Sequence, residues 1–143
     1  MSTVSSILSR KGRLSVTVSP DASVAEALQI MADKNIGSVV VMHGEEYLGI
    51  MTERDYSRKV ILKGKHSTST KISEIMSTDL PAVKPNDTIE HCMEMMTSKN
   101  IRYMPVFENN KMSGIISMSD IVKETIIMQK DTINHLESYI RNV

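Results

Sequence analysis

Two copies of one short pattern decide how this chain folds: Gly49-Ile-Met-Thr52-Glu-Arg-Asp55 and Gly114-Ile-Ile-Ser117-Met-Ser-Asp120. Both have the form Gly-hydrophobic-x-Thr/Ser-x-x-Asp, and they lie 65 positions apart. The same shift places Pro20 on Pro85 and aligns the sequence from Pro20 to Lys59 without an insertion. A glycine, a proline and an aspartate in one register predict an internal repeat.

Each repeat is expected to fold in the order β-α-β-β-α, which places the chain in the α+β class. An extended segment runs up to the proline, apolar residues at helical spacing then indicate an amphipathic helix, and two strand-like runs flank a turn. A second helix follows the motif. The first repeat should comprise an extended segment at 14–18, a helix with Val24, Ala27, Leu28 and Met31, strands at 38–42 and 47–51, and a helix over 53–62. The second should comprise an extended segment at 82–83, a helix with Ile89, Cys92, Met93 and Met96, strands at 104–107 and 112–117, and a helix from Ser119 onward.

Neither repeat alone buries both faces of its sheet, so the two are expected to pack through their sheets with pseudo-two-fold symmetry. The polar stretch 63–70 has no apolar periodicity and should link them. We therefore expect an N-terminal segment and the first repeat in residues 1–66, the second repeat in 67–128 and a C-terminal helical extension in 129–143.

The composition excludes several classes of protein. Lys plus Arg equals Asp plus Glu at 17 each, and the 143 residues include one Phe, four Tyr and no Trp. Balanced charge and few aromatic rings argue against a nucleic-acid partner. The single cysteine and the absence of a long apolar run or signal peptide indicate a cytoplasmic protein that does not enter a membrane.

The repeated motif has a chemistry that can be derived from its residue types. Its Thr or Ser hydroxyl and its Asp fall at the N-terminus of the second helix, where free N–H groups favour anions. Glycine lets backbone come close to a ligand, and a carboxylate can accept hydrogen bonds from the two hydroxyls of a ribose. The alternative is that Thr52 and Ser117 are only helix caps, with Asp55 and Asp120 as favourable first-turn charges.

The two motifs and the repeat around them, over about residues 14 to 128, resemble a tandem pair of cystathionine-β-synthase (CBS) domains, a Bateman module of the small stand-alone bacterial type. The resemblance implies an adenine nucleotide (AMP, ADP, ATP or NAD) in a cleft between the repeats and a homodimer formed through the helices 23–32 and 53–62 and their counterparts. It also implies the ligand-binding residues, which are Ile36, Gly37, Ser38, Thr52 and Asp55 from the first repeat and Ile101, Arg102, Tyr103, Ser117, Ser119 and Asp120 from the second. The helix after the first motif offers Arg54, Arg58 and Lys59 as a basic set for the Asp55 site, with solvated surface as the alternative for Arg54 and Lys59. Because Gly37 stands where the second repeat has Arg102, the two sites are not equivalent.

No feature of the sequence indicates catalysis. There is no Walker A loop, no Gly-x-Gly-x-x-Gly, and the four histidines lack metal-ligand spacing. We therefore expect a regulatory module, not an enzyme, with no catalytic cofactor or metal, that acts on a separate effector protein, buffers a nucleotide or signals through its own assembly. The alternative is an interaction scaffold without a bound ligand.

The C-terminal tail carries apolar residues in alternating steps of four and three, which is a heptad-like pattern interrupted by one glutamine. Its members are Val122, Ile126, Gln129, Ile133, Leu136, Ile140 and Val143. Asp131-Thr132 is an alternative start for a separate helix. The apolar face is expected to pack either on the surface of its own chain or on a second subunit.

Overall fold

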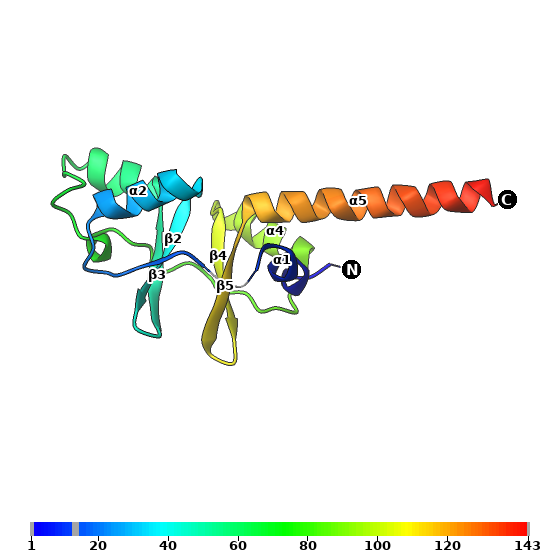
Figure 1. Cartoon of the computed structure of the whole chain (residues 1–143), viewed down its shortest axis with the longest axis horizontal. Helices are drawn as coiled ribbons and strands as arrows, with labels where there is room; N and C mark the ends of the chain where they lie inside the picture. The colour runs from blue at the N-terminus through cyan, green and yellow to red at the C-terminus, as the bar shows by residue number, and fades with distance from the viewer. Residues whose placement is uncertain (1, 13–14, 143) are drawn as a thin grey trace. The chain divides into compact units, whose positions relative to one another are not determined.

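The computed structural model describes residues 2–12 and 15–142 (Figure 1). The chain divides into two compact units, residues 15–81 and residues 2–12 with 82–142. Leu14 and Val143, which belong to the expected first strand and to the heptad pattern, lie outside the described residues.

The unit formed by residues 15–81 contains the first repeat. Its three-stranded sheet has the order β1-β2-β3, with β1 parallel to β2 and β2 antiparallel to β3. The apolar face of α2 packs in one core with β2 and β3 because its buried residues recur at helical spacing. The elements are β1 (Thr17–Val18), α2 (Val24–Lys34), β2 (Ser38–His43), β3 (Glu46–Thr52), α3 (Glu53–Tyr56), the π-helical turn Ser57–Ile61 and the 3-10 turn Ile72–Glu74.

The second unit repeats this arrangement in residues 82–142. Two antiparallel strands form its sheet, and Val83 pairs in parallel with Val106 as Val18 pairs with Val41 in the first unit. The elements are α1 (Val4–Lys11), α4 (Ile89–Lys99), β4 (Tyr103–Glu108), β5 (Lys111–Ser117) and α5 (Met118–Arg141). The predicted β-α-β-β-α order and the α+β class are confirmed.

The 65-residue register extends to details of the backbone. Asn35 and Asn100 end the first helix of each repeat in the left-handed conformation, with φ of 53° and 52°. Asparagine tolerates this conformation better than other residues with a side chain, because its short amide can bond locally. Both β-hairpins also shift register at matching positions, after Val41 and after Val106.

Helix α1 packs in the core of the second repeat, although it precedes the first repeat in the chain. Val4, Ile7 and Leu8 lie at helical spacing and are buried among core residues of the second repeat. The Val4 N–H donates to the Asp87 carbonyl at 2.9 Å. Residues 72–76 likewise pack with the first repeat rather than the second. The compact units therefore differ from the boundaries 1–66 and 67–128, because buried apolar contacts and not chain order define them.

The C-terminal extension is a continuation of α5. The helix runs unbroken from Met118 to Arg141, and the Thr132 hydroxyl donates to the Met128 carbonyl one turn earlier at 3.0 Å. A separate helix starting at Asp131-Thr132 is therefore wrong. Residues 129–142 are exposed, so the apolar face of this segment is not covered by the part of the chain that the structure describes.

Candidate functional site

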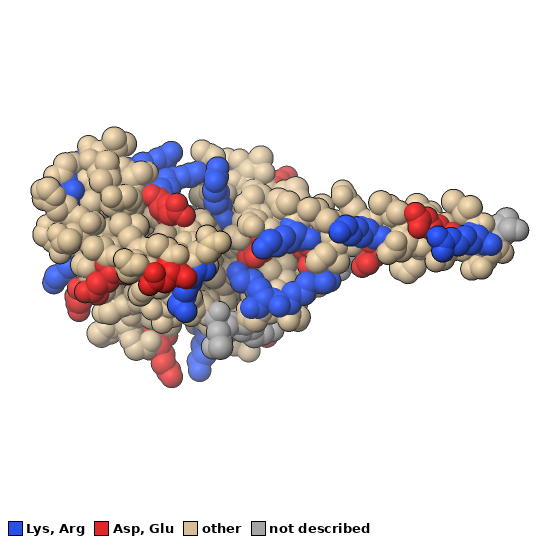
Figure 2. Space-filling model, turned by 45° about the horizontal axis from the view of Figure 1, so that its top comes forward, with Lys and Arg blue, Asp and Glu red and all other residues tan. Residues whose placement is uncertain are grey.

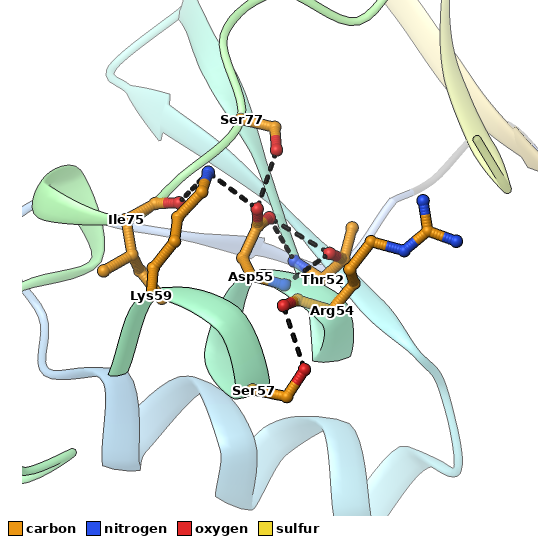
Figure 3. A network of polar contacts seen from close by, with 7 residues as sticks. All are labelled: Thr52, Arg54, Asp55, Ser57, Lys59, Ile75 and Ser77. Carbon is orange, nitrogen blue, oxygen red and sulfur yellow. Dashed lines mark hydrogen bonds and ion pairs between the residues drawn. The ribbon is translucent and has the colours of Figure 1, made fainter. Parts of the chain in front are cut away.

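The motif of the first repeat forms a reciprocal cap at the start of α3 (Figure 3). The Thr52 hydroxyl accepts a hydrogen bond from the Asp55 N–H at 3.1 Å. In return, Asp55 Oδ2 accepts from the Thr52 N–H and from the Thr52 hydroxyl, both at 3.0 Å. This geometry satisfies helix N–H groups that lack intrahelical partners, so Thr52 and Asp55 do form a helix cap.

The second carboxylate oxygen of Asp55 is also engaged. Oδ1 accepts from the Ser77 hydroxyl at 2.8 Å and forms an ion pair with Lys59 Nζ at 2.8 Å. Lys59 Nζ in turn donates to the Ile75 carbonyl at 2.9 Å. Asp55 is only 4% exposed, and a buried carboxylate requires such partners because it has lost its water. Lys59 thus neutralises Asp55 rather than standing free on the surface.

The second repeat reproduces the cap with a different cation. Ser117 Oγ accepts from the Asp120 N–H at 3.1 Å, and Asp120 Oδ2 accepts from the Ser117 N–H at 2.9 Å. The ion pair comes from Lys11 of α1, with Nζ 2.7 Å from Asp120 Oδ2. Lys11 Nζ also donates to the Ile115 carbonyl at 3.0 Å. Each motif carboxylate therefore has a lysine whose ammonium also binds a nearby backbone carbonyl.

The difference between the repeats follows from one position. Shifting Lys59 by 65 residues gives Glu124, so α5 presents two carboxylates one turn apart, Asp120 and Glu124, and has no lysine at the position equivalent to Lys59. The end of α1 supplies both cations. Arg10 lies with Nε 3.0 Å from Oε2 of Glu124, which is 2% exposed, and Lys11 takes Asp120.

Sequence reasoning missed Arg10, Lys11, Ser77 and Glu124. A signal for Arg10 and Lys11 was present, because the second repeat replaces the lysine four residues after the motif aspartate by a glutamate. Ser77 had no such signal, since its contact with Asp55 depends on how the linker packs.

The sequence interpretation explained Gly49 by the close approach of a ligand, but the structure gives a different reason for a glycine at this position. A Cβ at this position would lie 2.5 Å from the Ser77 carbonyl oxygen. The segment at Ser77 pairs with β3 through two backbone bonds to Ile50, of 3.0 and 2.8 Å. In the first repeat the glycine therefore allows the chain itself to come close.

Within each unit the remaining predicted residues lie beside the motif. Ser38 pairs with Thr52 in the sheet, and the Gly37 carbonyl accepts from the Glu53 N–H at 3.2 Å. In the second unit Tyr103 pairs with Ser117, and the Arg102 carbonyl accepts from the Met118 N–H at 2.8 Å. These contacts bring the two ends of each predicted set together, 36–38 with 52–55 and 101–103 with 117–120.

The predicted polar side chains differ in exposure. Arg58, Arg102 and Ser119 are exposed, and Arg102 forms no ion pair within residues 2–12 and 15–142. A purely structural ion pair for Arg102 therefore finds no support in the described part of the chain.

Cys92, predicted on the apolar face of its helix, faces the core of the second unit, whereas its neighbour His91 is exposed. Burial, followed by the negative charge of Asp87, raises the pKa of Cys92 to about 11. A thiol with this pKa is a poor nucleophile near neutrality. Among the described residues no group of three His, Cys, Asp or Glu side chains is placed to hold a metal ion, and no helix is long and apolar enough to cross a membrane.

Comparison with known proteins agrees with the repeat. The family model described as CBS domain matches twice, at residues 4–61 and 72–126. The CBS domain-containing protein CBSX3, mitochondrial, of Arabidopsis thaliana is 33% identical over 97% of this chain and 72% of its own length. The structure of a protein with CBS domains from Burkholderia ambifaria MC40-6 matches with a TM-score of 0.84 and 39% identity, covering 88% of this chain and 95% of that one.

A more distant structural neighbour is the CBS domain pair of protein MJ0100, crystallised with 5′-methylthioadenosine and S-adenosyl-L-methionine. It has 24% identity and a TM-score of 0.76, covering 87% of this chain and 96% of that chain. At this identity the match concerns the fold. The repeat, the motifs and these matches together show that this chain belongs to the CBS domain family, as a tandem CBS pair.

Proposed function

We propose that this chain is a regulatory module, not an enzyme, that binds an adenosine-containing ligand such as AMP, ADP, ATP or NAD in the cytoplasm and acts on a separate effector protein. The observation that carries the proposal is the duplication of one arrangement. In each unit a carboxylate and a hydroxyl stand at the N-terminus of a helix, beside the backbone that leads from the first helix into the sheet. The ligands crystallised with the MJ0100 pair both contain adenosine, which supports this ligand class.

Ribose would bind by exchanging partners at the motif carboxylate. Asp55 already accepts from a neutral hydroxyl, that of Ser77 at 2.8 Å, and a ribose hydroxyl can take the same place. The exchange leaves the Lys59 ammonium next to the ligand, where it can neutralise a phosphate. Lys11 also forms an ion pair with its motif carboxylate, Asp120, through the oxygen that accepts from the Ser117 N–H.

The same contacts favour a second candidate function. Both carboxylates are already paired with lysines of their own chain, so neither needs a ligand to be satisfied. A scaffold whose sites remain empty would show this arrangement. Calorimetry with AMP, ADP, ATP, NAD and S-adenosylmethionine separates the two candidates, because only the regulatory module gives saturable binding. Nucleotide that is unchanged after long incubation would separate it from an enzyme.

Asp120→Ala should weaken binding of the preferred nucleotide by about 10- to 100-fold, the effect of losing a hydrogen bond to a charged group. The free energy of unfolding should fall by only about 1 kcal/mol, because Ser117 still caps α5. Calorimetry and urea denaturation measure the two quantities. The matched control is Glu124→Gln, which loses an ion pair one turn later on α5 and should leave affinity unchanged. If Asp120→Ala lowers the free energy of unfolding but leaves the affinity for the nucleotide unchanged, Asp120 is only a structural cap.

Arg102→Leu should weaken AMP far more than adenosine, because a guanidinium holds phosphate through two parallel hydrogen bonds. The effect on AMP should shrink as salt is raised, since the contact is exposed to solvent. The affinities of the wild type and of Arg102→Leu for AMP and for adenosine are measured, and the loss for AMP is compared with the loss for adenosine. Equal losses for AMP and adenosine would show that Arg102 does not contact the phosphate.

We also propose a homodimer formed through the helical segments 23–32 and 53–62 and their counterparts. Ile61 and Leu62, at the end of the second segment, are 55% and 75% exposed, and such a dimer would remove their apolar surface from water. Light scattering should give at least twice the 16.0 kDa of one chain, and Leu62→Glu should weaken association. Thr68→Glu adds the same charge at a nearby exposed position and should not. A mass of 16.0 kDa at micromolar concentration would contradict the proposal.

A further inference from the structure

The C-terminal half of α5 has no packing partner among the described residues. Beyond Gln129 every described residue is exposed, and Ile133, Leu136 and Ile140 are 53, 57 and 72% exposed. Figure 1 shows this part of α5 extending past the other elements of its unit. A lone helix of this length is marginal in water, because most helical stability in proteins comes from burying an apolar face. The match to the CBS domain family ends at residue 126, so the segment is an addition to the tandem pair.

The exposed side chains occupy one seam with a heptad period. The a positions hold Ile126, Ile133 and Ile140, and the d positions hold Val122, Gln129 and Leu136. All three a positions are isoleucine, and leucine fills one of the three d positions, Leu136. β-Branched residues at a with leucine at d favour two-stranded parallel coiled coils. We propose that this seam, residues 122–140, binds the same seam of a second copy of this chain in a parallel, in-register coiled coil.

Gln129 favours the parallel alignment. In that alignment Gln129 lies opposite Gln129 of the second copy, and the two amides can satisfy each other because each carries both donors and acceptors. In the antiparallel alignment that pairs the other apolar layers, Gln129 would lie against Ile133 and lose its hydrogen-bond partners. A single polar residue in a coiled-coil seam commonly selects register in this way.

The charges around the seam also fit a second copy. The e positions hold Lys123, Lys130 and Glu137, whereas the g positions hold Thr125, Thr132 and Tyr139. No e–g′ pair of a parallel dimer therefore brings like charges together. Residues 122–142 contain three Lys or Arg and three Asp or Glu, and Figure 2 shows both signs along this part of α5. Such a balanced face lacks the excess of basic residues that helices on anionic membranes have.

Cross-linking through a single introduced cysteine tests the alignment on the full chain. Leu136→Cys should oxidise to a disulfide-linked dimer, because d positions of a parallel pair face each other within disulfide reach. Ser138→Cys, on the opposite side of the same turn, is the matched control and should link at least about tenfold more slowly. The native Cys92 is buried, with its pKa raised to about 11, and does not compete.

Carrying out the assay in the Leu62→Glu background separates this contact from the proposed dimer at segments 23–32 and 53–62. Linking of Leu136→Cys there supports the coiled coil even if the other interface fails. If only a mixture of Leu136→Cys and Ile126→Cys chains links, the parallel alignment is overturned. If Leu136→Cys links no faster than Ser138→Cys, and the mixture of Leu136→Cys and Ile126→Cys chains does not link either, the seam does not bind a second copy of this chain and the proposal is wrong. Gln129→Leu should tighten association about tenfold, because it removes the polar layer.

Discussion

Replacing Gly49 by alanine should lower the free energy of unfolding by about 3–4 kcal/mol, the sum of an overpacked contact and weakened backbone hydrogen bonds. The new Cβ would lie 2.5 Å from the Ser77 carbonyl oxygen, and a backbone atom cannot move aside as the end of a flexible side chain can. Moving the segment at Ser77 stretches its two bonds to Ile50 and withdraws its hydroxyl from Asp55. Urea denaturation followed by circular dichroism measures the loss.

Gly64→Ala is the matched control for Gly49→Ala. Gly64 has a φ of +68°, but an added Cβ meets no atom within 4 Å. Its cost is therefore only the strain of a left-handed alanine, about 1–2 kcal/mol. If Gly49→Ala costs no more than Gly64→Ala, the close approach of Ser77 does not account for the glycine in the first motif.

Arg10→Met should destabilise the unit of residues 2–12 and 82–142 by about 2–3 kcal/mol, because removing one partner leaves an uncompensated charge in the interior. The partner is Glu124, whose side chain is 2% exposed and whose two oxygens lie 3.0 and 3.5 Å from the guanidinium. Denaturant unfolding of the wild type and the variant measures the difference. The matched control is Lys11→Met on the same helix, since Asp120 is 15% exposed and water can hydrate it. That variant should cost about 1 kcal/mol.

The double variant Arg10→Met/Glu124→Leu completes the test. Replacing a buried ion pair by apolar residues of similar size is often neutral or stabilising, so most of the lost stability should return. A double variant as unstable as Arg10→Met alone would mean that α1 depends on Arg10 for something other than Glu124. In that case the pair would not explain why α1 folds against α5.

The two proposed sites differ in which part of the chain supplies the lysine that pairs with the motif aspartate. Lys59 follows Asp55 on the same helical segment, so the first site is complete within its own repeat. Lys11 comes from α1, which contacts the second repeat from outside the repeated sequence. A ligand that displaces Lys11 from Asp120 would therefore also release one of the contacts that hold α1. This asymmetry is additional to the one between Gly37 and Arg102.

The repeat itself was decided by the sequence alone. Helix and strand periodicities are local properties, and both copies carry them at the same spacing, so α2 and α4 and the paired strands were predictable. The caps formed by Thr52 and Ser117 were predictable for the same reason, because a hydroxyl and an aspartate three residues apart interact within one helical turn. The exposed seam of α5 was also visible, since Ile126, Ile133 and Ile140 recur along one helix.

Tertiary structure decided which partners the motif residues have. Nothing local connects Lys11 with Asp120 or Arg10 with Glu124, because these pairs are separated by more than a hundred residues and meet only when α1 packs beside α5. The reason for Gly49 likewise lies in a carbonyl oxygen 28 positions later in the sequence, at Ser77. Periodicity reports which face of an element is buried, whereas the identity of the neighbour on that face depends on the path of the whole chain.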